Sequence, residues 1–152
     1  MMQPGENTEL CVRSFGELSA EELYEIMALR QSVFVVEQNC PYQDMDGADR
    51  EALHVFLRDG EGIKAYLRVL PAGAVFEDVS IGRVLSVLRR RGFASRLLDE
   101  GIRLARERFG AERIVIEAQT YARTLYEKAG FRQISEEFLE DGIPHIKMFL
   151  AL

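Results

Sequence analysis

One segment constrains the fold of this chain more than any other, and it reads Ile81-Gly82-Arg83-Val84-Leu85-Ser86-Val87-Leu88-Arg89-Arg90-Arg91-Gly92-Phe93-Ala94. An apolar strand is followed by three arginines, a Gly-x-small turn and a long amphipathic stretch. Backbone N–H groups at the start of a helix are unpaired and carry the positive end of its dipole, so such a turn favours phosphate. Gly92 and Ala94 leave room for phosphate oxygens near the main chain, and the arginines add positive charge. We therefore expect a group containing a pyrophosphate to bind at this strand-to-helix junction.

The composition limits the class of protein. A chain of 152 residues with 47% apolar and 29% charged residues suits a single domain over 1–152, in which 1–8 form a flexible terminus. The net charge of −6 argues against nonspecific binding of nucleic acid, although a pocket can still be basic locally. The first residues, Met1 to Glu6, do not resemble a signal peptide, and no apolar run is long enough to span a bilayer. We expect a soluble, cytoplasmic protein with no membrane partner.

Cysteine and carboxylate spacing gives no indication of a metal site. Cys11 and Cys40 are far apart and lack CxxC spacing, so neither a zinc site nor a disulfide framework is suggested. The acidic loop from Asp44 to Asp49 does not fit calcium, because an EF-hand register would place Leu53 at the bidentate position. We expect two reduced thiols and no metal.

The hydrophobic pattern alternates strands and helices. Ser19-x-x-Glu22 has the form of a capping box and predicts a helix that continues to Phe34, followed by a polar loop over 37–47. Strands are expected over 52–57, 64–70, 74–87, 113–117, 131–137 and 146–150, and further helices over 95–109 and 121–129. The predicted fold class is α/β (α+β), with a mixed sheet of about six to seven strands and about four helices on its faces.

Two motifs together resemble the GNAT acyltransferase superfamily. Arg89-x-x-Gly92-x-Ala94 is similar to its R/Q-x-x-G-x-G/A signature, and the segment QTYARTLYEKAGF over 119–131 is similar to its N-x-x-A-x-x-L-Y-E-K-x-G-F segment. The stretches 33–47, 81–84 and 140–148 look like the ElaA-like branch of that superfamily. The resemblance covers almost the whole chain, from the first helix to the end.

The resemblance implies a GNAT fold that binds acetyl-CoA. In such folds two neighbouring parallel strands separate, the pantetheine arm lies between them, and the turn binds the pyrophosphate. Here the first of these strands ends at Val84-Leu85-Ser86, and the second contains Ile114 to Glu117. The predicted cofactor contacts are Val84, Leu85 and Ser86 of the strand, Arg89, Arg90, Arg91, Gly92, Phe93, Ala94 and Ser95 of the turn, and Gln119, which stands where the family usually has Asn.

The resemblance also implies direct transfer of an acetyl group to the primary amine of a small molecule or protein. Family enzymes commonly use the tyrosine of the L-Y-E-K segment, here Tyr126, to protonate the departing thiolate, a role that suits a phenol with a pKa near ~10. An alkylamine must lose a proton before it attacks, so a base is needed. Glu37 and His145 are the preferred candidate bases, and Asp46 and His54 are weaker candidates that we expect to contact the acceptor.

Structural alternatives exist for several of these residues. Tyr126 on a short helix also fits core packing, His54 between apolar neighbours is typical of a hydrogen-bonded structural histidine, and the loop carboxylates could cap local backbone donors. A noncatalytic module that senses acyl-CoA would share the cofactor turn, as would a synthase of signalling lactones, which would also need a lipid tunnel. The sequence leaves open the amine acceptor, the acyl chain length and the oligomeric state, a homodimer included.

Overall fold

Local sequence signals set the first helix. In this computed structural model, which describes residues 7–88 and 92–152, Ser19 caps helix α1 (Ala20–Arg30). The backbone N–H of Glu22 donates to the Ser19 hydroxyl at 3.0 Å, and the Ser19 N–H donates to the Glu22 carboxylate at 2.9 Å. This predicted capping box satisfies N–H groups that a helix start leaves unpaired. The chain then continues as a π-helical segment, η2 (Gln31–Glu37), so the helical stretch extends past Phe34 with a change of winding.

The remaining elements alternate between strands and helices, joined by short 3-10 turns. Strand β1 (Glu9–Ser14) and turn η1 (Phe15–Glu17) precede α1. After η2 come η3 (Ala48–Arg50), β2 (Leu53–Asp59), β3 (Gly62–Leu70), β4 (Ser80–Ser86), α2 (Phe93–Phe109), β5 (Arg113–Gln119), η4 (Thr120–Ala122), α3 (Arg123–Lys128), β6 (Arg132–Gln133), β7 (Phe138–Glu140) and β8 (Ile143–Ala151).

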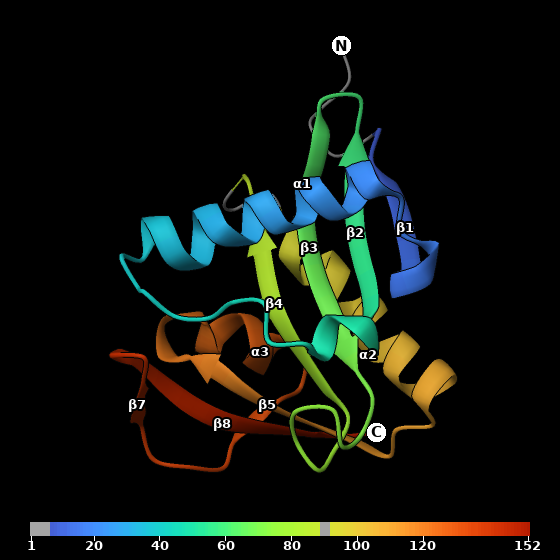
Figure 1. Cartoon of the computed structure of the whole chain (residues 1–152). Coiled ribbons are helices and arrows are strands. Elements are labelled where there is room, and N and C mark those ends of the chain that lie inside the picture. The colour runs from blue at the N-terminus through green and yellow to red at the C-terminus, as the bar shows by residue number, and fades with distance from the viewer. Residues whose placement is uncertain (1–6, 89–91) are drawn as a thin grey trace.

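The strands form two sheets that meet at one point. β1, β2, β3 and β4 pair in that order, and β8 pairs with β5, β6 and β7. Figure 1 shows β4 and β5 starting close together and separating toward their carboxyl ends. Near their start the N–H of Val115 donates to the carbonyl oxygen of Val79 at 3.1 Å. The predicted α+β fold is confirmed, and among the described residues its strands divide into two four-stranded sheets.

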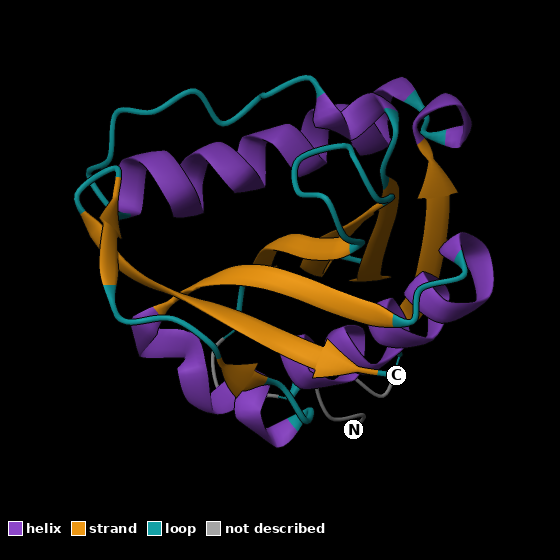
Figure 2. Ribbon diagram, turned by 90° about the horizontal axis from the view of Figure 1, so that it is seen from below, coloured by secondary structure: helices purple, strands orange, loops and turns teal. Residues whose placement is uncertain are grey.

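Helices cover both faces of the first sheet, and Figure 2 shows strands lying between helices on two sides. Leu97 and Leu98 of α2 are fully buried in the main core with Leu67 of β3. On the opposite face, Ile26 of α1 is fully buried with Phe56 of β2. A strand covered on both faces needs apolar side chains at successive positions, which explains why β3 lacks a polar alternation. Because helices cover both faces of this sheet, β4 has a fixed position beside the place where it separates from β5.

Several predicted boundaries were wrong for local reasons. The sequence predicts a strand from Ala74, but 71–79 form a loop in which Gly73 donates to the carbonyl of Phe76 at 2.8 Å, and β4 begins at Ser80. Of the predicted strand over 131–137, only Arg132–Gln133 forms a strand, β6, and the next strand, β7, begins at Phe138. Strand β1 is missing from the prediction because it is an edge strand, where polar residues are tolerated and the apolar alternation is weak.

Residues 1–6 and 89–91 lie outside the described part of the chain. The expectation of a flexible terminus over 1–8 therefore falls mostly outside it, as do the predicted contacts of Arg89, Arg90 and Arg91. Among the described residues, no helix has the length and apolar character needed to cross a membrane.

Candidate active site

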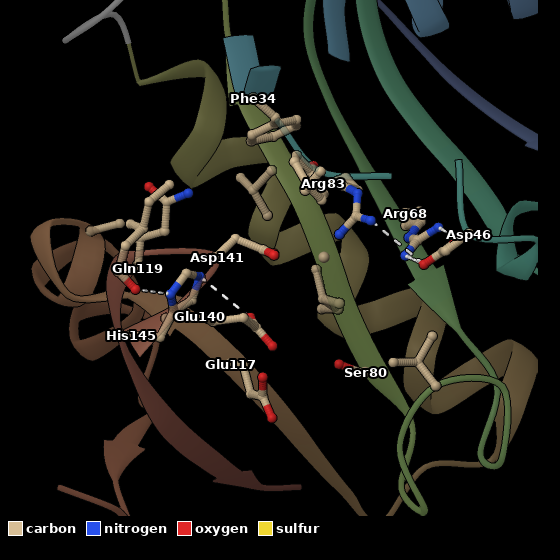
Figure 3. A pocket seen from close by; sticks show the side chains of 18 of the residues that line it. Phe34, Asp46, Arg68, Ser80, Arg83, Glu117, Gln119, Glu140, Asp141 and His145 are labelled. Carbon is tan, nitrogen blue, oxygen red and sulfur yellow. Dashed lines mark hydrogen bonds and ion pairs between the residues drawn. The ribbon is translucent and has the colours of Figure 1, made fainter. Parts of the chain in front are cut away.

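A cavity of about 360 Å³ lies where the two sheets separate. It is lined by β4 and β5, the loop before η3, helix α3 and the turn between β7 and β8. Figure 3 shows Arg83, Arg68 and Asp46 along one wall, and Glu117, Glu140 and His145 along the opposite wall. This volume is typical of the lower range for small-molecule sites. The cavity is therefore the candidate site for a reaction between two bound groups.

The predicted phosphate turn lies at the start of α2. Gly92 is exposed and has φ 75°, the left-handed conformation that glycine adopts at little cost. Helix α2 begins at Phe93, whose ring is buried in the core, and the exposed Ser95 lies in its first turn. The first N–H groups of a helix have no partner within it. The structure thus has a helix start where the sequence predicts phosphate binding, and the contacts of Gly92, Phe93, Ala94 and Ser95 with cofactor stay predictions.

A bulge in β4 brings two residues to the cavity wall. The pairing with β3 shifts so that Arg83 and Val84 together face the single residue Leu67. Arg83 has φ 53°, a left-handed conformation that is uncommon for a residue with a side chain and is found at functional sites. Both bulge residues line the cavity, whereas Leu85 packs in the core against α1 and Ser86 is not among the lining residues. Of the three strand residues predicted to contact the cofactor, only Val84 lines this cavity.

Three arginines and three aspartates form an ion-pair network along the first wall. Arg30 donates to Asp49 at 2.6 Å and to Asp44 at 2.9 Å, Arg68 donates to Asp46 at 2.7 Å and to Asp49 at 3.0 Å, and Arg83 lies 2.7 Å from Asp44 and 3.5 Å from Asp46. The guanidinium groups of Arg30 and Arg68 are almost completely buried. Because positive and negative side chains are equal in number, this wall carries little net charge.

Asp46 lines the cavity, but its carboxylate is already bound by Arg68. Burial by itself raises the pKa of Asp46, yet the hydrogen bonds from Arg68 and the nearby charge of Arg83 hold that pKa well below its usual range. A carboxylate held in this way is a poor proton acceptor. The prediction that Asp46 contacts the acceptor stays untested, and its main interactions are structural.

His54 does not line the cavity, so the structure does not bring it to the place where the sequence predicts a contact with the acceptor. The ring is fully buried within the first sheet. Its Nδ1 lies 2.7 Å from the Tyr66 hydroxyl, and its Nε2 lies 2.9 Å from the Asp49 carbonyl oxygen. Burial lowers the pKa of His54, because desolvation disfavours the charged imidazolium. The alternative of a hydrogen-bonded structural histidine fits this position.

Tyr126 of α3 lines the cavity from a nearly buried position. Its side chain is 8% exposed, and its ring packs edge-on against Phe131 at 5.9 Å between centroids. No described residue forms a hydrogen bond with its hydroxyl, although a buried phenol usually has such a partner. Burial raises the pKa of Tyr126 far above its ordinary value, so the phenol is protonated at neutral pH. The ring contributes to the core, and its hydroxyl remains available to a ligand.

The two predicted bases differ in their position. His145 of β8 lines the cavity, and its Nδ1 lies 2.7 Å from the Ile143 carbonyl oxygen. Because a carbonyl oxygen only accepts, Nδ1 must donate in this contact, and in the neutral ring Nε2 then carries the free electron pair. The Nε2 atom lies 3.6 Å from a Glu140 carboxylate oxygen. Glu37 is exposed at the end of η2 and is not among the residues that line the cavity. Only His145 of this pair is therefore brought to the site.

Gln119 ends β5 and lines the cavity, as does Gln38, which follows η2. Each side-chain amide donates to the other: Gln38 Nε2 to Gln119 Oε1 at 3.0 Å, and Gln119 Nε2 to Gln38 Oε1 at 3.2 Å. The thiol of Cys40 donates to the carbonyl of Asp141 at 3.4 Å, so the loop after η2 also contacts the β7–β8 turn. These contacts connect segments that are far apart in the sequence across the cavity. The predicted cofactor contact of Gln119 would compete with Gln38.

Comparison with known proteins explains this geometry. The family described as Acetyltransferase (GNAT) domain matches residues 15–152. The chain belongs to the GNAT acetyltransferase family. The GNAT fold of this protein implies acyl-CoA binding.

The relatives and solved structures span nearly the whole GNAT domain. A UPF0039 protein of Schizosaccharomyces pombe is 37% identical over 150 residues, which cover 96% of this chain and 99% of the relative. The Escherichia coli protein ElaA is 37% identical over 136 residues, with 87% and 89% covered, and its crystal structure matches 95% of this chain and 99% of that chain with a TM-score of 0.87 and 34% identity. An acyl-CoA N-acyltransferase from Pseudomonas aeruginosa matches 94% of this chain and 99% of that chain with a TM-score of 0.86 and 34% identity.

Sequence reasoning missed one pair of residues at the GNAT site. Glu117 of β5 and Glu140 of β7 line the same wall, and Figure 3 shows their carboxyl groups on the cavity side. Burial, hydrogen bonding to Glu140 and repulsion from its charge raise the pKa of Glu117 to about 7, against a smaller opposing effect of Lys147. The available signal was a charged residue directly after the apolar run Ile114 to Ile116 in a strand predicted to be buried.

The described residues offer no separate metal centre. Among 7–88 and 92–152, no group of three His, Cys, Asp or Glu side chains is arranged to hold a metal ion. Cys11 and Cys40 are both buried free thiols.

Proposed function

We propose that this protein transfers an acetyl group from acetyl-CoA directly to the primary amine of a small molecule or protein. The observation that carries the proposal is the cavity between β4 and β5, which is lined by the nearly buried Tyr126, a residue whose hydroxyl has no hydrogen-bond partner among the described residues. A protein that only bound acyl-CoA, without catalysing a reaction, would not need the phenol of Tyr126 at this cavity. We place the protein in the cytoplasm, where its two thiols stay reduced.

The described residues fit acetyl-CoA in two places. The exposed start of α2 offers first-turn N–H groups to a pyrophosphate, beside Gly92 with open space around it. The separation of β4 and β5 beyond Val79 leaves strand edges for the pantetheine arm, and the bulge at Arg83 and Val84 interrupts the regular pairing there. These features support a cofactor that enters at α2 and ends in the cavity.

The chemistry assigns distinct tasks to the chain's own residues. When bound, acetyl-CoA supplies the activated thioester. Strands β4 and β5, each held by its pairing with a neighbouring strand, position the reacting groups. Tyr126 donates its proton to the sulfur that departs, which a phenol kept protonated by burial can do. The reaction also requires a group that takes a proton from the incoming ammonium.

Binding of the cofactor is tested with a charge placed at the start of α2. We expect isothermal titration to show acetyl-CoA binding by the unmodified protein, and Ser95→Asp to weaken it about tenfold or more because the new carboxylate repels the pyrophosphate. The same carboxylate interacts favourably with the helix dipole, so the variant should melt no earlier than the unmodified protein. Ser32→Asp, at an exposed position of η2, is the matched control and should bind normally.

Turnover is tested by release of free thiol from acetyl-CoA over a panel of primary amines. Acetylation of at least one amine, confirmed by the mass of the product, is the expected result. Absence of acetyl-CoA binding would overturn the proposal entirely. Binding without turnover on any amine would instead indicate the noncatalytic acyl-CoA sensor.

A further inference from the structure

Two carboxyl groups face the cavity from two strands of the second sheet that both pair with β8. Glu117 lies on β5 and Glu140 at the end of β7, and both strands pair with β8 between them. The Glu140 side chain is about half exposed, and Glu117 is partly buried. Two carboxyl groups that face one cavity repel each other when both are ionised, which favours a form of the pair that retains one proton. Near neutral pH the pair can therefore both bind a cation and accept a proton.

The charged side chains around Glu117 and Glu140 determine which kind of ligand these two residues can attract. Across the strands Lys147 of β8 pairs in register with Glu117, and His145 of β8 lies 3.6 Å from Glu140. The other charged side chains that line the cavity are Asp141 of the β7–β8 turn, Asp46 of the loop before η3, Arg68 of β3 and Arg83 of β4. Both arginines are already bound by Asp44, Asp46 and Asp49.

The two walls thus differ in their capacity for a charged ligand. The arginine wall has its positive charges matched by aspartates, so it offers little to a carboxylate or a phosphate. The glutamate wall has the three acidic residues Glu117, Glu140 and Asp141. Its basic neighbours are His145, which lines the same wall, and Lys147, which pairs in register with Glu117, so acidic groups are in excess and the wall favours a cation. Tyr126 provides an independent sign of a ligand at this place, since this nearly buried residue lines the same cavity and its hydroxyl has no partner among the described residues.

We propose that the Glu117–Glu140 carboxyl pair binds the ammonium group of the acceptor and takes its proton, and that the acceptor is an amine with no carboxylate beside the reacting nitrogen. The inference rests on the proposed acetyl transfer and specifies the acceptor class and the proton acceptor. His145 is then a positioning residue, because its Nε2 faces Glu140 and the ring stacks on Phe138 at 6.1 Å between centroids.

The step balances with the groups at hand. The ammonium nitrogen gives one proton to the ionised oxygen of the pair and regains a free electron pair. That electron pair forms the C–N bond with the thioester carbon, and the C–S bond breaks with its electrons on sulfur. Sulfur takes the proton of Tyr126, and the nitrogen's second proton restores the phenol. The pair later releases its proton to solvent, so an ammonium and a thioester give an amide, a thiol and one proton.

The first test measures the shared proton without any reaction. We expect infrared difference spectra between acid and alkaline pH to show one carboxyl group that titrates near pH 7, and we expect Glu117→Gln and Glu140→Gln each to remove that signal. Glu137→Gln changes an exposed carboxylate in the segment just before β7 and should leave the signal unchanged. A protein that binds acetyl-CoA but lacks this titration would overturn the inference and leave the proposed function standing.

The second test compares amines with their carboxylated counterparts. Ethanolamine and serine, phenethylamine and phenylalanine, histamine and histidine, and tryptamine and tryptophan are offered with acetyl-CoA. For every pair in which a product forms, we expect the amine to have kcat/KM at least about tenfold above the amino acid, because a carboxylate is repelled by the glutamate wall. A preference for the amino acids, or no product from any of these amines, would overturn the inference.

The third test separates the two glutamates by their pH profiles. Glu117→Gln should lower kcat about a hundredfold at pH 7, with partial recovery at high pH where free amine is abundant in solution. Glu140→Gln should move the acidic limb of the profile to lower pH, because Glu117 then loses its partner's repulsion. Glu137→Gln should match the unmodified protein. Equal profiles for all variants would assign both glutamates a structural role only.

Discussion

The side chains of Gln38 and Gln119 are joined by two amide hydrogen bonds, at 3.0 and 3.2 Å between nitrogen and oxygen. Gln38 lies directly after the π-helical segment η2, and Gln119 is the last residue of β5. The contact therefore connects the layer of α1 to the second sheet across the end of the cavity. A ligand that takes the place of Gln38 at the Gln119 amide breaks these hydrogen bonds, so we predict that acetyl-CoA binding depends on Gln38.

We expect Gln38→Ala to bind acetyl-CoA more tightly than the unmodified protein. Without its partner, the Gln119 amide is left unsatisfied in the free protein, and the cofactor then gains a hydrogen bond without breaking one. A net hydrogen bond contributes about 1 kcal/mol, so the dissociation constant should fall roughly fivefold in isothermal titration. Gln31→Ala, in the exposed start of η2, should show no change. Weaker binding by Gln38→Ala would mean that the amide pair persists in the complex and shapes the site.

The buried ion network gives a prediction about stability. Asp49 accepts from Arg30 at 2.6 Å and from Arg68 at 3.0 Å, and both arginine side chains are almost completely buried. Asp49→Asn leaves two buried arginines with one carboxylate fewer, and it should reduce the free energy of unfolding by about 3 kcal/mol in urea denaturation. Asp78→Asn breaks a pair with Arg113 at the surface and should cost far less. If both variants lost a similar free energy of unfolding, burial would not be the reason that the ion pairs of Asp49 stabilise the fold.

The same network sets the acid limit of the fold. Burial raises the pKa of Asp46 and of Asp49, but hydrogen bonds and charge from their arginine partners outweigh it and leave both pKa values below the usual range. The unfolded chain therefore takes up protons first as the pH falls, so the stability from these groups is complete above about pH 4 and decreases below it. Asp49→Asn should flatten this acid dependence in urea titrations between neutral pH and about pH 2.

Most of the fold could be predicted because its signals are local. Ser19 and Glu22 predict the start of α1 from four residues of sequence. The β4–α2 junction is predicted in the same way, by an apolar strand that is followed by Gly92 and an amphipathic stretch. The edge strand β1 carries no comparable signal, because its pairing with β2 and not its own pattern holds it in place. The division into two sheets was also not predictable, since the chains of β4 and β5 meet near Val79 and Val115 and then separate, and the pattern of neither strand encodes that separation.

The site was predictable only where one segment supplies its chemistry. Tyr126 and Gly92 belong to short motifs, so the sequence places them correctly at the cavity and at the helix start. Glu117 and Glu140 become neighbours only through the pairing of β5 and β7 with β8, and no spacing in the sequence encodes that register. His54 shows the opposite case. Its residue type suggested a contact with the acceptor, but its ring is fully buried within the first sheet.

Glu117 should make the protein less stable at alkaline pH. Burial and Glu140 raise the pKa of Glu117 to about 7, so between its ordinary value and pH 7 the folded protein binds more protons than the unfolded chain. Stability from this group therefore falls as the pH rises through that range. With an allowance for solvent screening of the half-exposed pair, Glu117→Gln should raise the free energy of unfolding by about 1 kcal/mol at pH 8, with little change at pH 5.

Urea denaturation at both pH values measures this difference. Glu137→Gln, a change at an exposed carboxylate, should leave the pH dependence as it is. If Glu117→Gln is as stable as the unmodified protein at pH 8, its carboxyl group has an ordinary pKa and cannot be the shared-proton site. A gain in stability together with a loss of turnover would be the pattern of a residue retained for function at a cost to the fold.

Tyr126→Phe separates the role of the ring from the role of the hydroxyl. Phenylalanine keeps the edge-on packing against Phe131 at 5.9 Å and removes a hydroxyl that has no partner among the described residues, so the variant should be as stable as the unmodified protein or slightly more so. We expect kcat to fall about a hundredfold through loss of the proton donor, while the dissociation constant of acetyl-CoA stays within about twofold. Tyr24→Phe, at an exposed position of α1, controls for loss of a phenol elsewhere and should leave kcat unchanged. If turnover survives in Tyr126→Phe, the sulfur takes its proton from another group, and Tyr126 is a core residue whose position at the cavity has no catalytic consequence.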